Sequence, residues 1–102
     1  MDKIAALSEI LTADPTNAFA RYGLAMEHNT QGNTDLALNE FVTLIHHNPD
    51  YVPGYQMSAQ TLAKLGRTEE AIARLREGLA AAQRTSNAHA TSEMQTLLDD
   101  LS

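Results

Sequence analysis

Apolar residues recur along the chain with the spacing of α-helices, in six segments separated by short polar breaks. In the first segment Ile4, Leu7 and Leu11 are spaced i, i+3 and i+7, so they share one helical face. Pro15 and Pro49 mark two of the breaks, because proline cannot continue a helix. No segment shows sustained period-two alternation rich in β-branched residues. We therefore predict an all-α protein of about six helices arranged as antiparallel hairpins.

Two glycines are predicted to end helices. Gly32 and Gly66 follow the second and fourth predicted helices, and each is expected to take the left-handed conformation that often ends a helix. Thr34 and Thr68 come two residues later, and we expect each to cap the next helix. The acidic residues that follow each threonine suit the positive end of the helix dipole.

A similar sequence pattern occurs twice in the chain. "GNTDLALNEFVTLIHHNPD" begins at Gly32, and "GRTEEAIARLREGLAAAQR" begins at Gly66, 34 residues later. The shift of 34 also aligns Pro15 with Pro49, Ala25 with Ala59, Ala37 with Ala71 and Phe41 with Leu75. A helix–turn–helix unit of this length has the period of the tetratricopeptide repeat. The chain resembles that family, known as TPR.

The resemblance covers Thr16–Gln83 as two full repeats and implies an α-solenoid of stacked hairpins. Its large and small packing positions fall on Leu24, Ala25, Gly32, Ala37, Phe41, Pro49, Tyr55, Ala59, Gly66, Ala71 and Leu75. The alanines let two helix backbones approach closely. The implied organisation is a single domain, 1–102, with an N-terminal half-repeat helix (2–13), repeat 1 (16–49), repeat 2 (50–83) and a C-terminal capping helix (87–101).

Some positions depart from the family pattern. Arg21 stands where a bulky aromatic residue is usual, although Tyr55 restores the aromatic one repeat later. Ser58 replaces the usual leucine, Gly78 falls where alanine is common, and Gln83 replaces the final proline. We expect these changes to weaken individual contacts without altering the repeat.

Charge and composition exclude several classes of function. The formal net charge is −6, and residues 1–51 carry two basic and seven acidic side chains. No basic stripe is visible, so we expect neither nucleic-acid binding nor a polybasic membrane contact. No apolar run approaches the roughly 20 residues that span a bilayer, and the N-terminus does not resemble a signal peptide, so a cytoplasmic location is expected. The chain has no cysteine, which excludes disulfides and thiol chemistry.

No catalytic or metal-binding constellation is apparent. Common nucleophile, zinc, P-loop and dinucleotide motifs are absent. His46 and His47 are adjacent, so on a helix they diverge by about 100°, and a helix C-terminus favours their partial charge. His28 is interpreted as a packed residue, and Asp99 and Asp100 as solvated neighbours. We therefore expect no enzymatic activity, cofactor or metal.

The resemblance implies that the first helix of each repeat lines a concave groove. The candidate partner-binding residues are Phe19, Tyr22, Met26, Asn29, Gln56, Gln60 and Lys64. The first three are spaced i, i+3 and i+7 and form an apolar stripe. Two interpretations stay open: helix 2–13 covers this stripe and makes it core, or the stripe is an exposed aromatic and methionine patch for a partner.

The function that the resemblance implies is a non-catalytic protein–protein interaction module, a scaffold or adaptor that binds a peptide or helix through its groove. The alternative is a structural or assembly protein that self-associates, for example as a homodimer, through the ends of the helix stack. Some family members clamp C-terminal carboxylates with basic residues. The corresponding places here hold Tyr22, Met26, Met57, Asn87 and Thr91, so chaperone C-terminal tails are not the expected ligand.

The repeat alignment predicts the effect of one substitution. Ala71→Leu should lower the free energy of unfolding by about 1–3 kcal/mol or more, because a larger side chain overpacks the helix crossing. Thermal unfolding of the variant measures the change. An unaltered transition would mean that the repeats are aligned wrongly.

Overall fold

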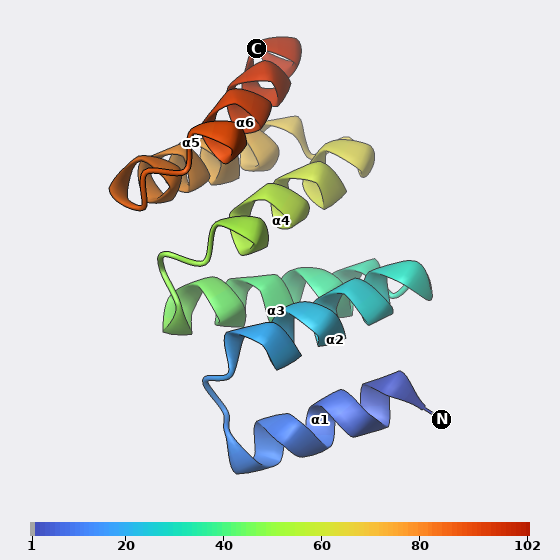
Figure 1. The fold of residues 1–102 in the computed structure, drawn as a ribbon. Helices are drawn as coiled ribbons and strands as arrows, with labels where there is room; N and C mark the ends of the chain where they lie inside the picture. Colours follow the sequence, from blue (N-terminus) through green and yellow to red (C-terminus); the bar gives the residue numbers. More distant parts are fainter. Residues whose placement is uncertain (1) are drawn as a thin grey trace. The chain divides into compact units, whose positions relative to one another are not determined.

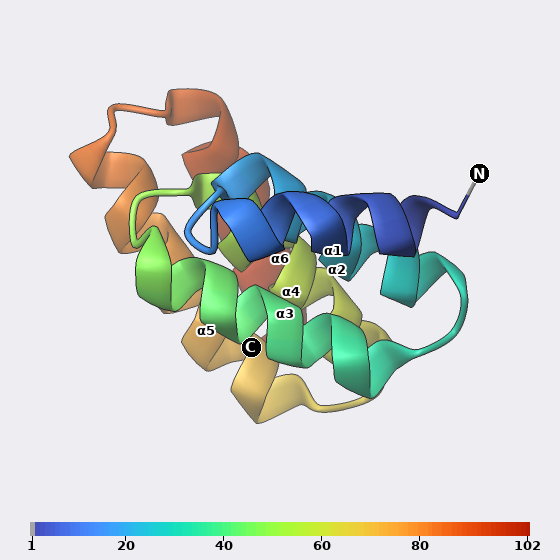
Figure 2. The same cartoon turned by 90° about the horizontal axis from the view of Figure 1, so that it is seen from below.

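Six α-helices make up the computed structural model, which describes residues 2–102 (Figures 1 and 2). They are α1 (Lys3–Ala13), α2 (Ala18–Thr30), α3 (Thr34–His47), α4 (Val52–Lys64), α5 (Thr68–Arg84) and α6 (Ala88–Leu101). No strand occurs in the described part of the chain. The predicted all-α class and the six helices are confirmed.

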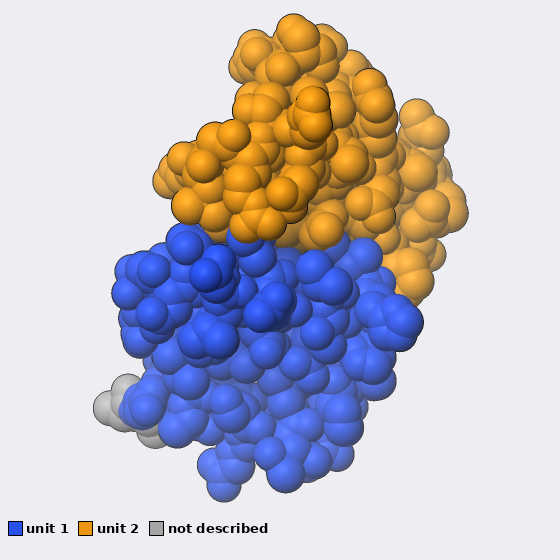
Figure 3. All heavy atoms as spheres, turned by 180° about the vertical axis from the view of Figure 1, so that it is seen from behind, with its two compact units in different colours: residues 1–48 blue, residues 49–102 orange. Residues whose placement is uncertain are grey.

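The helices fall into two compact units (Figure 3). Unit 1, residues 1–48, contains α1, α2 and α3, and unit 2, residues 49–102, contains α4, α5 and α6. Each unit is therefore one hairpin with one additional helix, α1 in unit 1 and α6 in unit 2.

Asparagine and aspartate side chains cap three of the helices. Asp2 accepts hydrogen bonds from the first-turn amides of α1, Asn17 accepts one from the Ala20 amide at 2.9 Å, and Asn87 accepts one at the start of α6. The expectation that Thr34 and Thr68 cap α3 and α5 was wrong. Both threonines lie inside the first turn, and the residues before them make no side-chain capping bond.

The turns that end α2, α4 and α5 share one construction. Gly32 and Gly66 have φ values of 83° and 76°, in the left-handed region that glycine enters without steric cost. The next amide then reaches back across the last turn, as when Asn33 N–H donates to the His28 carbonyl at 2.9 Å. Ser86, with φ 55°, occupies the same place after α5. The residue after each glycine, Asn33 or Arg67, takes the N-cap position of the next helix. Thr34 and Thr68 are therefore the first residues of α3 and α5 and not their caps.

Two apolar clusters organise unit 1. On one side of α2, Leu11, Ala20 and Leu24 form a buried cluster, and Ile4 and Leu7 of α1 pack against it. The large position Leu24 thus belongs to the α1–α2 contact. On the other side of α2, the hairpin with α3 buries Ala25, Ala37 and Phe41 completely.

Unit 2 buries its apolar residues around α5. Ala59 of α4 and Ala71 and Leu75 of α5 are fully buried, as are Ala82 of α5 and Met94 of α6. A side-chain methyl built on Gly78 would lie 2.7 Å from Met94 Sδ and 2.7 Å from Tyr55 Cβ. At Gly78, therefore, α5 lies too close to α4 and α6 to accept even a methyl group without a shift, and the position is not a weakened alanine position as we expected.

A polar side chain replaces leucine in the core of unit 2. Ser58 is completely buried, and its hydroxyl donates to the Tyr55 carbonyl at 3.4 Å. Arg74 Nη1 donates to the same Ser58 oxygen at 3.0 Å. Because both hydrogen-bonding functions of the hydroxyl are satisfied, burial of this serine carries little desolvation penalty.

The contacts of Gly78 predict that Gly78→Ala destabilises unit 2 by about 1–3 kcal/mol, even though alanine is the better helix former by about 1 kcal/mol. Tyr55 Cβ is fixed to its backbone and cannot rotate away from an added methyl. Urea unfolding monitored by circular dichroism measures the loss.

Gly23→Ala is the matched control for this experiment. Gly23 is also a helical glycine, but a methyl there would lie 3.4 Å from the flexible Leu7 Cδ atoms, which is an ordinary contact. It should leave stability unchanged or raise it by up to about 1 kcal/mol. Equal stability of Gly78→Ala and the unmodified chain would contradict the close approach at Gly78.

Candidate partner-binding surfaces

In unit 1, α1 covers one side of α2 and leaves another side open. Leu7 of α1 reaches the position of a Gly23 side chain, and the α1–α2 cluster buries Ala20 and Leu24. Phe19 lies outside this contact, and its side chain is 78% exposed. Within unit 1, therefore, the N-terminal helix does not cover the aromatic end of the predicted stripe.

The other members of the stripe are less open than Phe19. The Tyr22 ring meets Phe41 edge-on, with centroids 6.3 Å apart and planes at 62°, so Tyr22 contributes to the α2–α3 core. Tyr22, Met26 and Asn29 are half-buried. The stripe thus consists of one projecting aromatic side chain followed by side chains that present only part of their surface.

In unit 2, Gln56 and Gln60 of α4 line a groove of about 410 Å³ that α6 closes from the opposite side. The α6 residues that line it are Ser92, Glu93, Met94, Thr96, Leu97 and Asp100. Lys64, the last member of the predicted polar row, is exposed but does not line this groove. The structure therefore brings two of the predicted residues together with a set of α6 side chains that sequence reasoning missed.

Hydrogen bonding orders one end of this groove. Glu93 Oε1 accepts from Gln56 Nε2 at 3.1 Å and lies 3.2 Å from His89 Nε2. Asp100 makes no hydrogen bond or ion pair to any residue in 2–102. The groove, which we call the α4–α6 groove, offers two amides on one wall and two carboxylates on the other.

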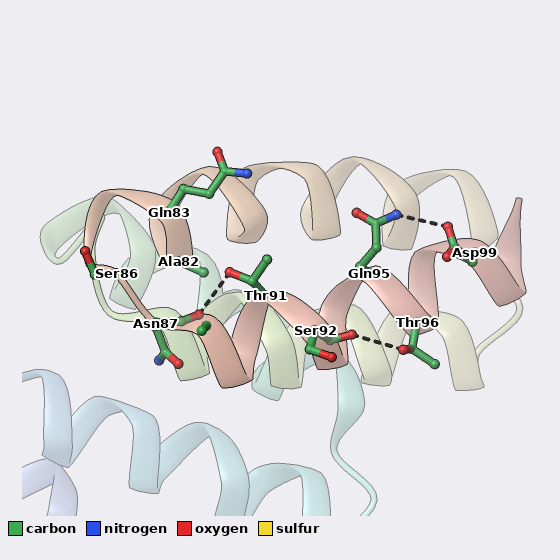
Figure 4. Close-up of a pocket in the computed structure, with 10 residues that line it drawn as sticks. Ala82, Gln83, Ser86, Asn87, Thr91, Ser92, Gln95, Thr96 and Asp99 are labelled. Atoms are coloured by element: carbon green, nitrogen blue, oxygen red, sulfur yellow. Dashed lines mark hydrogen bonds between the residues drawn. The ribbon is translucent and has the colours of Figure 1, made fainter.

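A second groove lies on the outer side of α5 and α6 (Figure 4). It has a volume of about 640 Å³ and is lined by Ala82, Gln83, Ser86, Asn87, Ala88, Thr91, Ser92, Gln95, Thr96 and Asp99. Figure 4 shows Thr91 and Gln95 projecting from α6 into the space beside α5, with Gln95 Nε2 donating to Asp99 at 2.9 Å. It is the larger of the two grooves, and apolar atoms make up most of its exposed surface, although many of its lining side chains also carry a hydroxyl, amide or carboxyl group. Within α6, Thr91, Thr96 and Gln95 direct such groups to Asn87, Ser92 and Asp99.

The N-terminal ends of α2 and α4, the first helices of the two repeats, are each held by a side-chain hydrogen bond to a proline carbonyl. The side chain that donates differs between the two helices. In unit 1, Arg21 Nη2 donates to the Pro15 carbonyl at 2.9 Å and pairs with Glu40 at 2.7 Å. In unit 2, the Tyr55 hydroxyl donates to the Pro49 carbonyl at 2.6 Å. Arg21 therefore performs the anchoring task of the aromatic residue, and we had expected it only to weaken a contact.

Burial changes the acid–base behaviour of the anchor in unit 2. Tyr55 is 4% exposed, and desolvation raises the pKa of its phenol above the ordinary value of 10.0, an effect that the nearby positive charge of Arg84 partly offsets. Arg84 also donates to Asp50 at 2.9 Å and to the Pro49 carbonyl at 3.2 Å. The phenol thus lies within a structural network and not at a solvent-filled pocket.

Potential metal ligands do not cluster in the described part of the chain. No three His, Cys, Asp or Glu side chains within 2–102 lie close enough together to hold an ion. His46 and His47, the adjacent histidines near the end of α3, are exposed, with ring centroids 5.5 Å apart. Nor does this part of the chain contain a helix long and apolar enough to cross a membrane.

Comparison with known proteins identifies the family. The tetratricopeptide repeat family model matches residues 28–93, more than half of the chain, and the chain therefore belongs to this family. A solution structure of a tetratricopeptide repeat domain protein from Salinibacter ruber is 33% identical, with a TM-score of 0.81 over 86% of this chain and 89% of that one. A crystal structure of a Salinibacter ruber domain gives 32% identity and a TM-score of 0.78 over 83% of this chain and 96% of that one.

A solution structure of a Bordetella parapertussis protein shares the fold at 24% identity. Its TM-score is 0.82, over 99% of this chain and 88% of that chain. No curated protein matches the sequence. Membership of the TPR family indicates a protein-interaction module in general, since domains of this family are generally non-catalytic and take protein partners.

The pKa shift of Tyr55 predicts a pH dependence of stability. The folded chain keeps this proton to higher pH than the unfolded chain, so the anchor contributes stability below pH 10 that is lost as pH rises through the folded-state pKa. In an absorbance titration of the three tyrosines, one phenol should ionise late, and Tyr55→Phe should remove that late phase. If Tyr55→Phe instead removed a phase that titrates with the ordinary pKa of tyrosine, the buried position of Tyr55 would be contradicted.

Proposed function

We propose that the chain is a non-catalytic adaptor or scaffold that binds a peptide or helix of a partner protein through the first helices of its repeats. In unit 1 the contact surface is the side of α2 that carries Phe19, with parts of Tyr22, Met26 and Asn29. In unit 2 it is the α4–α6 groove with Gln56 and Gln60, and Lys64 lies beyond it on α4.

The exposure of Phe19 is the observation that carries this proposal. A phenylalanine with 78% of its surface in water gives nothing to the core, and aromatic side chains are enriched at the centres of protein interfaces. Helix α1 has an apolar face of its own but buries it against Ala20 and Leu24, so the Phe19 side of α2 stays accessible within unit 1. Polar side chains on either side would complete an interface rim.

Replacement of Phe19 by serine tests this surface. Because the side chain is exposed, Phe19→Ser should change the free energy of unfolding by no more than about 0.5 kcal/mol. It should nevertheless reduce capture of a specific partner from a lysate of the native host by about tenfold or more, as loss of an interface hot spot does. Quantitative mass spectrometry of the captured proteins measures the change.

Val42→Ser is the matched control, because Val42 is an exposed apolar residue on α3, the second helix of the same hairpin, with 52% of its surface accessible. The control should retain the partner. If Phe19→Ser and the unmodified chain capture the same proteins in equal amounts, the binding surface does not include this side of α2.

Self-association is the second candidate, and the groove between α5 and α6 favours it. At about 640 Å³ this groove offers a place for a further helix at the end of unit 2, and a homodimer would fill it with a second copy. Light scattering over a range of protein concentrations distinguishes a dimer from a monomeric adaptor.

A further inference from the structure

We propose that the α4–α6 groove selects an extended segment of a partner that carries lysine or arginine side chains. This inference rests on the proposed function and specifies the chemistry of the partner. Its elements are the two amides of α4, the apolar floor between the helices and the two carboxylates of α6.

The amide wall favours an extended segment. Gln60 is exposed at the groove and presents its whole amide to a ligand. Gln56 Nε2 already donates to Glu93, so Gln56 presents its amide oxygen as an acceptor. An extended backbone has free N–H and C=O groups to meet such amides. A helix satisfies those groups internally and would meet the amides only with its side chains.

The floor provides a limited apolar contact. Leu97 is half-buried and exposes part of its side chain to the groove, above the completely buried Met94. The aliphatic stems of lysine and arginine can lie on such a floor while their charged ends extend to the rim. The groove therefore fits a long basic side chain better than a short polar one.

The charge of the groove has one sign. Among residues 2–102, Glu93 and Asp100 are the acidic residues that line it, and no lysine or arginine in that range does. The imidazole of His89 lies 3.2 Å from Glu93 at one end of the groove. Three arginines of unit 2 are already paired outside the groove, Arg67 with Glu70, Arg74 with Glu77 and Arg84 with Asp50. A basic segment would thus supply the cations that unit 2 itself does not direct into the groove.

The position of Asp100 is unfavourable for α6 itself. It lies in the last turn of the helix, where the dipole is negative and where the chain has no basic residue. Its carboxylate has no partner within residues 2–102. An acidic residue in this position is suited to bind a cation from outside the chain. Residues that lower the stability of their own helix are often functional residues.

The test is selection of displayed random decapeptides on the full chain, followed by fluorescence anisotropy with the enriched sequences. Enriched peptides should be rich in lysine and arginine, and the double variant Glu93→Gln/Asp100→Asn should bind them about tenfold more weakly. Added salt should weaken the same binding, because exposed charges are screened.

Asp99→Asn is the matched control, because Asp99 is the neighbour of Asp100 in the same helical turn but lines the groove on the α5 side. This control should bind the basic peptides as the unmodified chain does. An equal loss in Asp99→Asn and in Asp100→Asn would mean that overall net charge attracts the peptides, and would overturn the assignment to the groove.

The remaining outcomes separate this inference from the proposed function. Enriched peptides without basic residues that bind in the groove, as shown by loss of binding in Gln60→Arg, would overturn the preference for basic segments and leave peptide binding intact. If no peptide is enriched, and Phe19→Ser captures the same proteins as the unmodified chain, both the inference and the proposed function fail.

Discussion

Close approach of helix backbones at small side chains is the constraint on which each unit of this protein depends. Ala25 and Ala37 in unit 1, and Ala59 and Ala71 in unit 2, are all completely buried in their hairpins. A methyl group or a hydrogen atom at such a crossing lets the larger neighbours interdigitate at the density of a protein interior. Gly78 extends the rule, because α5 approaches both α4 and α6 so closely there that no side chain fits.

A second constraint holds the starts of the first helices, and it tolerates a change of chemistry. A guanidinium in unit 1 and a phenol in unit 2 both donate to a proline carbonyl six residues earlier. Both bonds connect the chain that enters the hairpin to the helix that follows, and so hold the start of that helix. What the repeat needs at this position is therefore a long side chain with a donor at its tip.

These constraints leave certain surfaces without a role in packing, and the proposed function uses those surfaces. The hairpin core uses Phe41 and part of Tyr22, and the contact with α1 uses Ala20 and Leu24, which leaves Phe19 in water. In unit 2, α5 packs against the buried side of α6, and the side toward α4 keeps a groove with amides and carboxylates. A repeat fold of this kind binds through surface chemistry that packing does not determine.

The sequence by itself determined the helices, their order and the repeat. The spacing of apolar residues, the prolines and the glycine turns each act over a few residues. They therefore predict the helices without knowledge of the tertiary contacts. It did not reveal that Leu24 belongs to the α1 contact, that Arg21 replaces an aromatic anchor, or that Glu93 and Asp100 of α6 face Gln56 and Gln60 of α4. Asp100, an acid in the last turn of α6 without a basic neighbour, was a sequence signal for that groove. Only the tertiary structure decided these points, because they depend on contacts between helices that are distant in sequence. Helical periodicity shows which residues share a face of a helix, but it does not show what that face contacts.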